Sequence, residues 1–156
     1  MKGKTIIIDL DGTLSNSVQR IKLVSENPKD YEQFYKRISE DTPNKWATKI
    51  LELIDHYNFS CDNKEEIRII LLTGRPEWTR KTTIEWLNKH TILKPYDYDL
   101  IMREDKDYRH DYDYKRERIK EIKKKHKILF SIDDRPGPWR AFRDEGITCL
   151  FCGVIE

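Results

Sequence analysis

Short apolar runs recur along the chain and are separated by longer segments of mixed polarity. Each run is almost continuously apolar, which is typical of parallel strands covered on both faces. Strands with one face in water would instead alternate apolar and polar residues. The sequence therefore predicts five buried strands, at 5–9, 67–72, 99–102, 127–132 and 148–152.

The segments between these runs carry the spacing of amphipathic helices. In the segment 44–57, Trp46, Ile50 and Ile54 recur at helical intervals. Further helices are predicted at 77–90, 112–126 and 137–145. This alternation predicts an α/β protein with a three-layer, Rossmann-like fold, in which a central parallel sheet of about five strands is flanked by helices. Residues 15–41 interrupt the alternation and are predicted to form a small, mainly helical insertion in a single domain that spans 1–156.

Polar residues follow three of the predicted strands. Asp9 and Asp11 close the first, Thr73-Gly74-Arg75 follows the second, and Asp133-Asp134 follows the strand at 127–132. Ligands of open parallel sheets bind outside the carboxyl ends of the strands, where these residues meet. Carboxylates at the end of a buried strand are costly unless a cation holds them, and Gly12 would let the backbone turn close to a ligand. One such cluster is compatible with an ordinary Asp-Gly turn, but three at matching ends favour a functional site.

A lysine is placed on the buried face of the helix predicted at 112–126. Tyr112, Lys115, Ile119 and Ile122 follow one another at i, i+3, i+7 and i+10, which forms one helical stripe. An inward lysine needs an anionic partner, and Asp111 lies one turn earlier. The alternative is that Lys115 extends to the surface, as most lysines do, and this segment alone does not decide between the two.

Composition indicates a soluble protein without a disulfide framework. The 156 residues suffice for one buried core, 37% of them are charged, and the formal net charge is only +2. No run of 18 apolar residues is present, and the N-terminus lacks the pattern of a signal peptide, so a cytoplasmic protein with no membrane span is expected. The three cysteines are an odd number, which argues against a disulfide framework. Cys149 and Cys152 have metal-like spacing, but no second Cys or His pair lies nearby and the four histidines form no ligand-spaced pair, so no zinc site is expected.

Two features suit nucleic-acid binding but have simpler explanations. The run 115–127 holds eight Lys or Arg residues, which a solvated helix face explains more simply than electrostatic steering of a polyanion. Aromatic residues stack on bases in many complexes, but Trp86 lies at helical spacing and is expected in the core. Tyr108 and Tyr112 are better placed for the rim of the site.

Four segments together resemble a known superfamily. DLDGTLS (9–15), LLTGR (71–75), Lys115 and IDDRP (132–136) are similar, in the same order, to the four motifs of haloacid dehalogenase-type phosphatases. The segments 40–44, 73–90, 98–115 and 132–151 further resemble the 3′-phosphatase domain of bacteriophage polynucleotide kinase. No GxxxxGK[ST] phosphate loop occurs, so no kinase domain is expected, and the segment after the first motif departs from that branch.

The resemblance implies a Mg²⁺-dependent reaction through an aspartyl-phosphate. Asp9 is the implied nucleophile, and Asp11 is the implied acid and then base. Asp133 and Asp134 would hold Mg²⁺ together with Asp9 and the backbone carbonyl of Asp11, although the sequence leaves open which of the two contacts the metal directly. The remaining catalytic and substrate-binding candidates are Thr73, Lys115, Arg20, Gly74, Arg75 and Asp111.

The implied activity is removal of 3′-phosphates from DNA or RNA ends. The alternatives are a nucleotidase or another small-molecule phosphatase on the same scaffold, and a non-catalytic module that binds nucleic-acid ends. An intact Asp9 and Asp11 pair argues against the last, since a binder needs neither nucleophile nor acid. The sequence leaves open the choice between DNA and RNA, the oligomeric state, and whether a separate kinase or ligase acts with the chain.

Overall fold

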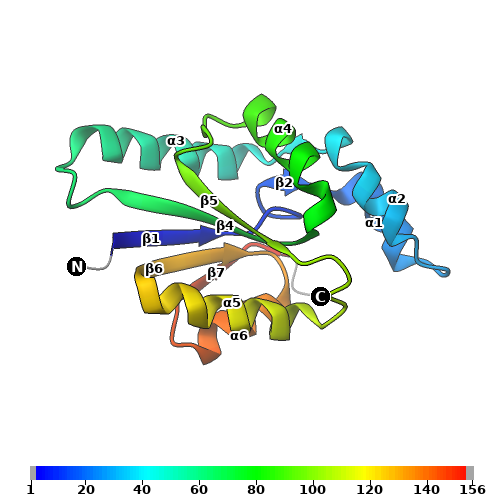
Figure 1. Ribbon diagram of the computed structural model, residues 1–156. Coiled ribbons are helices and arrows are strands. Elements are labelled where there is room, and N and C mark those ends of the chain that lie inside the picture. Colours follow the sequence, from blue (N-terminus) through cyan, green and yellow to red (C-terminus); the bar gives the residue numbers. More distant parts are fainter. Residues whose placement is uncertain (1–2, 154–156) are drawn as a thin grey trace.

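A five-stranded parallel sheet forms the centre of the computed structural model, which describes residues 3–153 (Figure 1). The strand order is β5-β4-β1-β6-β7, and every neighbouring pair is parallel. This confirms the predicted fold class. The strands are β1 (Gly3–Ile8), β4 (Ile67–Pro76), β5 (Tyr98–Arg103), β6 (His126–Asp133) and β7 (Cys149–Phe151).

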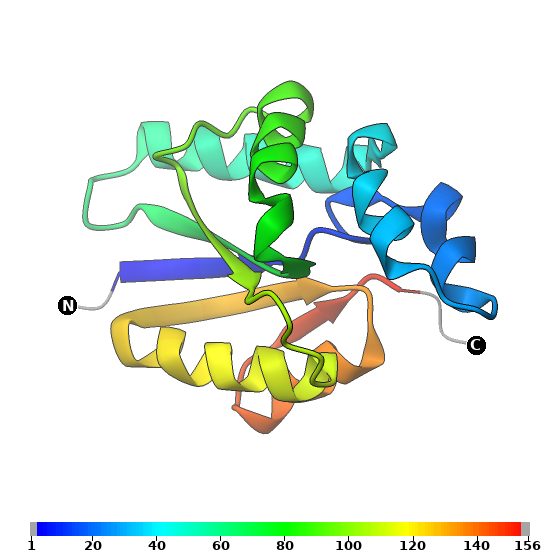
Figure 2. The ribbon, with the colours of Figure 1, turned by 45° about the vertical axis from the view of Figure 1, so that its right-hand side comes forward.

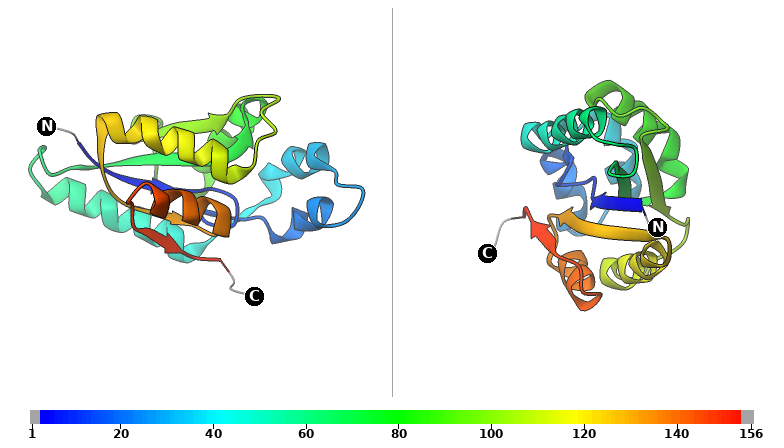
Figure 3. Two further views of the ribbon diagram at one scale, coloured as in Figure 1. Left: turned by 90° about the horizontal axis from the view of Figure 1, so that it is seen from below. Right: turned by 90° about the vertical axis from the view of Figure 1, so that its left-hand side faces the viewer.

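Helices cover both faces of the sheet, as the end-on view of Figure 3 shows. One face packs against α3 (Lys45–Ser60) and α4 (Arg80–His90), and the other against α5 (Asp111–Lys125) and α6 (Pro136–Asp144). Along β1, Ile6 and Ile8 enter the first core and Ile7 enters the second, because successive side chains of a strand point to opposite faces. Burying an aliphatic side chain of this size contributes about 1.5–3 kcal/mol, so both faces stabilise the sheet. No helix among residues 3–153 is long and apolar enough to cross a membrane.

Residues 15–43 form a compact addition at the carboxyl edge of the sheet (Figure 2). It begins and ends with an antiparallel pair of two-residue strands. Asp30 caps the second helix, because its Oδ1 accepts a hydrogen bond from the backbone N of Gln33 at 2.9 Å. The elements are β2 (Ser15–Asn16), α1 (Val18–Ser25), α2 (Tyr31–Lys36), the 3₁₀ turn η1 (Ile38–Glu40) and β3 (Thr42–Pro43).

Most element boundaries differ from the sequence prediction by a few residues, and two of these differences lie beside the candidate site. Strand β4 continues through 73–76, because Pro76 pairs with Arg103 beyond an irregularity in the register. The predicted helix 77–90 begins with a separate 3₁₀ turn, η2 (Glu77–Thr79), and α4 starts at Arg80. The backbone N of Trp78 donates to Asp105 Oδ1 at 3.0 Å, a distant partner that local periodicity does not reveal.

Candidate active site

Asp9, Lys115 and Asp133 meet at the carboxyl edge of the sheet. Asp9 directly follows β1, Asp133 ends β6, and Lys115 lies in the second turn of α5. The Lys115 Nζ donates to Asp9 Oδ1 at 2.7 Å and to Asp133 Oδ2 at 2.6 Å, and all three side chains are buried. Lys115 therefore faces the core beside Ile119 and Ile122, which is the inward one of the two orientations that the helical stripe left open.

The charges of this group are mutually dependent. Burial alone would lower the pKa of Lys115, but the Asp133 and Asp9 carboxylates outweigh it and raise that pKa above its usual value. Burial raises the pKa of Asp9 well above its usual value, against the lowering effect of Lys115 and with help from Asp133 and Asp134. Keeping Asp9 ionised therefore costs free energy, and a further cation beside it would reduce that cost.

A third carboxylate completes an acidic cluster suited to a metal. Asp9, Asp133 and Asp134 each offer a carboxylate oxygen, and these atoms lie within 4.8 Å of one another. Asp134 Oδ1 is buried without a hydrogen-bond partner, and burial together with Asp133 raises the pKa of Asp134 to about 6. An unpartnered buried carboxylate oxygen among other carboxylates fits a hard divalent cation such as Mg²⁺, which prefers oxygen ligands.

Gly12 makes this cluster possible. Its φ of +81° lies in the left-handed region that favours glycine, and a Cβ at this position would overlap the Asp134 carboxylate. The glycine was expected to let the backbone turn close to a ligand, and in the structure it lets the backbone turn close to Asp134.

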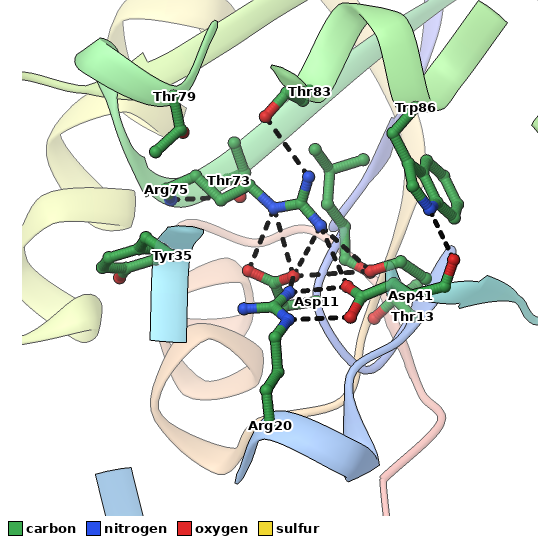
Figure 4. Close-up of polar contacts among 12 residues, drawn as sticks. Asp11, Thr13, Arg20, Tyr35, Asp41, Thr73, Arg75, Thr79, Thr83 and Trp86 are labelled. Atoms are coloured by element: carbon green, nitrogen blue, oxygen red, sulfur yellow. Dashed lines mark hydrogen bonds and ion pairs between the residues drawn. The ribbon is translucent and has the colours of Figure 1, made fainter. Parts of the chain in front are cut away.

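Asp11 belongs to a different cluster from Asp9. Residues two apart in a strand would share one side of the sheet, but β1 ends at Ile8, so Asp9 and Asp11 are not bound by that alternation. The Arg75 Nε donates to both Asp11 oxygens at 3.1 Å, Arg75 Nη2 donates to Oδ1 at 2.6 Å, and Arg20 Nη2 also donates to Oδ1 (Figure 4). Burial would raise the pKa of Asp11, but Arg75 and Arg20 outweigh it and lower the pKa to about 2. Asp11 is therefore ionised at neutral pH in this structure.

Asp41 contacts both Arg20 and Arg75, and nothing in the sequence singled it out as a site residue. Its carboxylate accepts from Arg20 Nε at 2.8 Å and from Arg20 Nη2 at 2.6 Å, and lies 3.5 Å from Arg75 Nη2. The Trp86 indole donates to the Asp41 backbone oxygen at 2.8 Å, which ties the loop to α4 (Figure 4). Both arginines are fully buried, so the structure gives them contacts with Asp11 and Asp41 and no open surface.

Thr73 and Gly74 lie on the last residues of β4. Thr73 is buried, and its Oγ1 accepts a hydrogen bond from the backbone N of Arg75 at 3.2 Å. A Cβ at Gly74 would lie 3.3 Å from Asp111 Oδ1, so this strand end passes close to the start of α5. The structure thus brings the second strand end beside the other two, as predicted.

Asp111 does not act on Lys115 as the helix spacing suggested. Its carboxylate instead accepts from Arg103 Nη2 and Arg135 Nη1, while Lys115 is held by Asp9 and Asp133. Arg103 is buried, lies 4.5 Å above the Tyr114 ring, and donates to the backbone oxygen of Arg109 at 2.6 Å. The sequence singled out neither arginine as an Asp111 partner, because both pairings join separate elements.

The structure also bears on three other expectations from the sequence. Tyr112 was expected at the rim, but its hydroxyl donates to Asp144 Oδ2 at 2.6 Å and it therefore faces α6. The basic run 115–127 covers most of α5 and extends into the first residues of β6, at the opposite edge of the sheet. Lys120 and Lys123 lie 3.8 and 3.5 Å from Glu145, so part of this run forms ion pairs with α6. Trp86 is buried as expected.

Fold and site together define a class of protein. A parallel sheet with an acidic cluster and a buried lysine at its carboxyl edge is the arrangement of phosphatases of the haloacid dehalogenase type. The class C acid phosphatase from Bacillus anthracis with tungstate bound has the same fold, with a TM-score of 0.65 and 14% identity over 98% of this chain and 67% of that one.

The family model of the polynucleotide kinase PNKP phosphatase domain matches residues 3–153, and the chain belongs to this family. A chain of the Pnkp1/Rnl/Hen1 RNA repair complex is 29% identical with a TM-score of 0.71, and the match covers 97% of this chain and 43% of that one. A second structure of the Pnkp1/Rnl/Hen1 complex gives 28% identity and a TM-score of 0.71, with 99% and 47% covered. The chain thus spans less than half the length of these two relatives. No curated protein matches it significantly.

Proposed function

We propose that the chain removes 3′-phosphates from DNA or RNA ends as a Mg²⁺-dependent phosphomonoesterase. The observation that supports phosphate transfer to Asp9 is its hydrogen bond from Lys115 within a cluster of three carboxylates. The similarity to a chain of an RNA repair complex supports a nucleic-acid end as the substrate, and a kinase or ligase as a functional partner.

The reaction consists of two displacements at phosphorus. Asp9 attacks the phosphorus, its carboxylate oxygen forms a bond to it, and the bond to the 3′-oxygen breaks. Water then attacks the aspartyl-phosphate, which frees Asp9 and inorganic phosphate. Lys115 and Thr73 donate hydrogen bonds to the phosphoryl oxygens, and Lys115 stabilises the charge that develops on them.

Asp9, Asp133 and Asp134 are the residues that would hold Mg²⁺, with the backbone carbonyl of Asp11. When bound, the ion offsets the repulsion between the carboxylate nucleophile and the phosphate dianion. The unpartnered oxygen of Asp134 supports this assignment.

Asp11 acts as acid in the first step and as base in the second. Its ionised form, held by Arg20 and Arg75, is ready to accept a proton from water. A phosphate dianion bound beside Asp11 raises its pKa, because like charges disfavour the ionised form, so that Asp11 takes up a proton from solvent and then donates it to the leaving oxygen. Arg20 and Arg75 position this carboxylate, and their phosphate contacts, if they form, require Asp11 to move aside.

The acid role predicts a dependence on the leaving group. We expect Asp11→Asn to slow hydrolysis of a 3′-phosphorylated oligonucleotide by about 10²–10⁴-fold, because the sugar oxygen leaves poorly without a proton. A nitrophenyl phosphate needs no such proton, so the burst of nitrophenolate that accompanies phosphorylation of Asp9 should be far less affected. Equal losses with the two substrates would exclude Asp11 as the acid.

The substrate assignment is tested by comparing ends. With Mg²⁺, we expect hydrolysis of 3′-phosphorylated oligonucleotides of differing sequence, little action on 5′-phosphorylated ends, and a KM that rises with salt because phosphate contacts are screened. The comparison measures kcat/KM on both kinds of end and on free 5′-mononucleotides. Equal values for mononucleotides and 3′-phosphorylated oligonucleotides would instead support the nucleotidase.

A further inference from the structure

A cleft of about 830 Å³ opens beside the candidate active site. It lies between α2 of the insertion, η2, and the loop 104–110, and it shares Gly74, Asp111 and Arg135 with the site. Its volume is that of clefts which hold nucleotide-sized ligands, about 300–1,000 Å³. The shared residues show that the cleft borders the candidate active site.

Two aromatic side chains from separate elements meet in this cleft. Tyr35 of α2 and Trp78 of η2 both line it, with ring centroids 6.4 Å apart and planes at 89°. The Tyr35 hydroxyl lies 3.5 Å from the Gly74 backbone oxygen, which places this pair next to the strand end that carries Thr73. Trp78 is 51% exposed, although its backbone is fixed by Asp105, so a large apolar ring stands at the surface beside the site.

Most of the charged side chains that line the cleft form ion pairs. Arg103 and Arg135 both contact Asp111, and Arg109 contacts Asp107 and Glu117. These ion pairs reduce the electrostatic attraction between the arginines and a distant polyanion. The aromatic surface is what the cleft offers to a ligand, and aromatic rings bind nucleobases of every sequence by stacking.

We propose that the last nucleobase of the strand binds in this cleft, stacked on Trp78 beside Tyr35, while its 3′-phosphate enters the site. This rests on the proposed function, since it assumes a nucleic-acid end as the substrate. The nucleoside next to the reacting phosphate would then be recognised by its aromatic base, without preference among the four bases.

The test compares substrates with and without that base. One oligonucleotide ends in a normal 3′-phosphorylated nucleotide, and a matched one ends in a 3′-phosphorylated abasic sugar. We expect Trp78→Ala to raise KM for the first about tenfold to a hundredfold with little change in kcat, and to leave KM for the second nearly unchanged. Trp78→Phe, which keeps a ring, should recover most of the loss.

The matched control is Phe59→Ala. Phe59 is 92% exposed and lies near the end of α3, one residue before the helix ends at Ser60, away from the cleft, so its loss should change neither KM.

A binding readout that needs no turnover uses Asp9→Asn protein and an oligonucleotide with 2-aminopurine as its last base. Its fluorescence should be quenched on binding, and adding Trp78→Ala should abolish the quenching.

The outcomes separate the two proposals. If the wild-type protein hydrolyses 3′-phosphorylated ends but Trp78→Ala raises KM equally for both substrates, or for neither, the stacking proposal is wrong and the proposed function stands. If the wild-type protein hydrolyses no 3′-phosphorylated end and 2-aminopurine is not quenched, both are wrong.

Discussion

Replacing Asp9 with asparagine is expected to reduce turnover by at least roughly 10⁴-fold, because the amide keeps the shape of the side chain but cannot attack phosphorus. The same change should leave the protein folded and, without metal, more stable than the wild type. Burial and two neighbouring carboxylates raise the pKa of Asp9, so its ionised form costs folding free energy at neutral pH, and asparagine removes that cost.

The size of this stability gain depends on pH. An acid whose pKa is raised in the folded state destabilises that state above the pKa of the unfolded chain. The gain from Asp9→Asn should therefore be present at pH 7 and should vanish as the pH falls below about 4, where Asp9 is protonated in both states. Denaturant unfolding with EDTA at several pH values measures this difference in the free energy of unfolding.

The matched control is Asp113→Asn, which changes an exposed aspartate on α5 and should change neither activity nor stability appreciably. Near-normal turnover in pure, folded Asp9→Asn protein would falsify the covalent mechanism.

Replacing Lys115 with methionine should have a large effect on both activity and stability. Loss of the donor to the phosphoryl oxygens is expected to lower kcat by about 10²–10³-fold. Without metal, the change also leaves Asp9 and Asp133 buried without their cation, which should lower the free energy of unfolding by about 3–5 kcal/mol. The raised pKa of Lys115 means that this contribution is fully present below its ordinary pKa and is lost only in strong base.

Added Mg²⁺ distinguishes this mechanism from a simple packing defect. A divalent ion in the acidic cluster would replace the missing charge, so it should recover part of the stability of Lys115→Met but none of its activity. The control is Lys120→Met on the exposed side of the same helix, which should be nearly neutral. Equal stability of Lys115→Met and wild type in EDTA would show that the two ion pairs do not hold the site together.

The parts of the site that follow from local pattern could be predicted from the sequence. Continuous apolar runs gave the strands, and the order of strands and helices gave the parallel sheet. From these followed the meeting of Asp9, Thr73 and Asp133 at one edge. The spacing of Lys115 with Ile119 and Ile122 placed it on the buried face of a helix, because a helix presents those positions on one face, but left open whether its end extends to the surface.

The parts that depend on pairing between distant elements could not be predicted. Asp41 contacts Arg20 across 21 positions, and Asp11 contacts Arg75 across 64, so no local period marks them. The low pKa of Asp11 follows from these partners and is equally hidden in the sequence. Nothing in the sequence sets Trp78 apart from the other tryptophans, because its value as a binding surface depends on Tyr35 from the insertion.

The most direct test of the account is to trap the phosphate on Asp9. The protein is mixed rapidly with a 3′-phosphorylated oligonucleotide and Mg²⁺, quenched, and treated with borohydride, which reduces an acyl phosphate to the alcohol. Mass spectrometry of the N-terminal peptide then locates the change. The account predicts conversion of Asp9 to homoserine that requires both the 3′-phosphate and Mg²⁺ and is absent with a 5′-phosphorylated oligonucleotide. Turnover of the 3′-phosphate without modification of Asp9, or with modification at another residue, would contradict it.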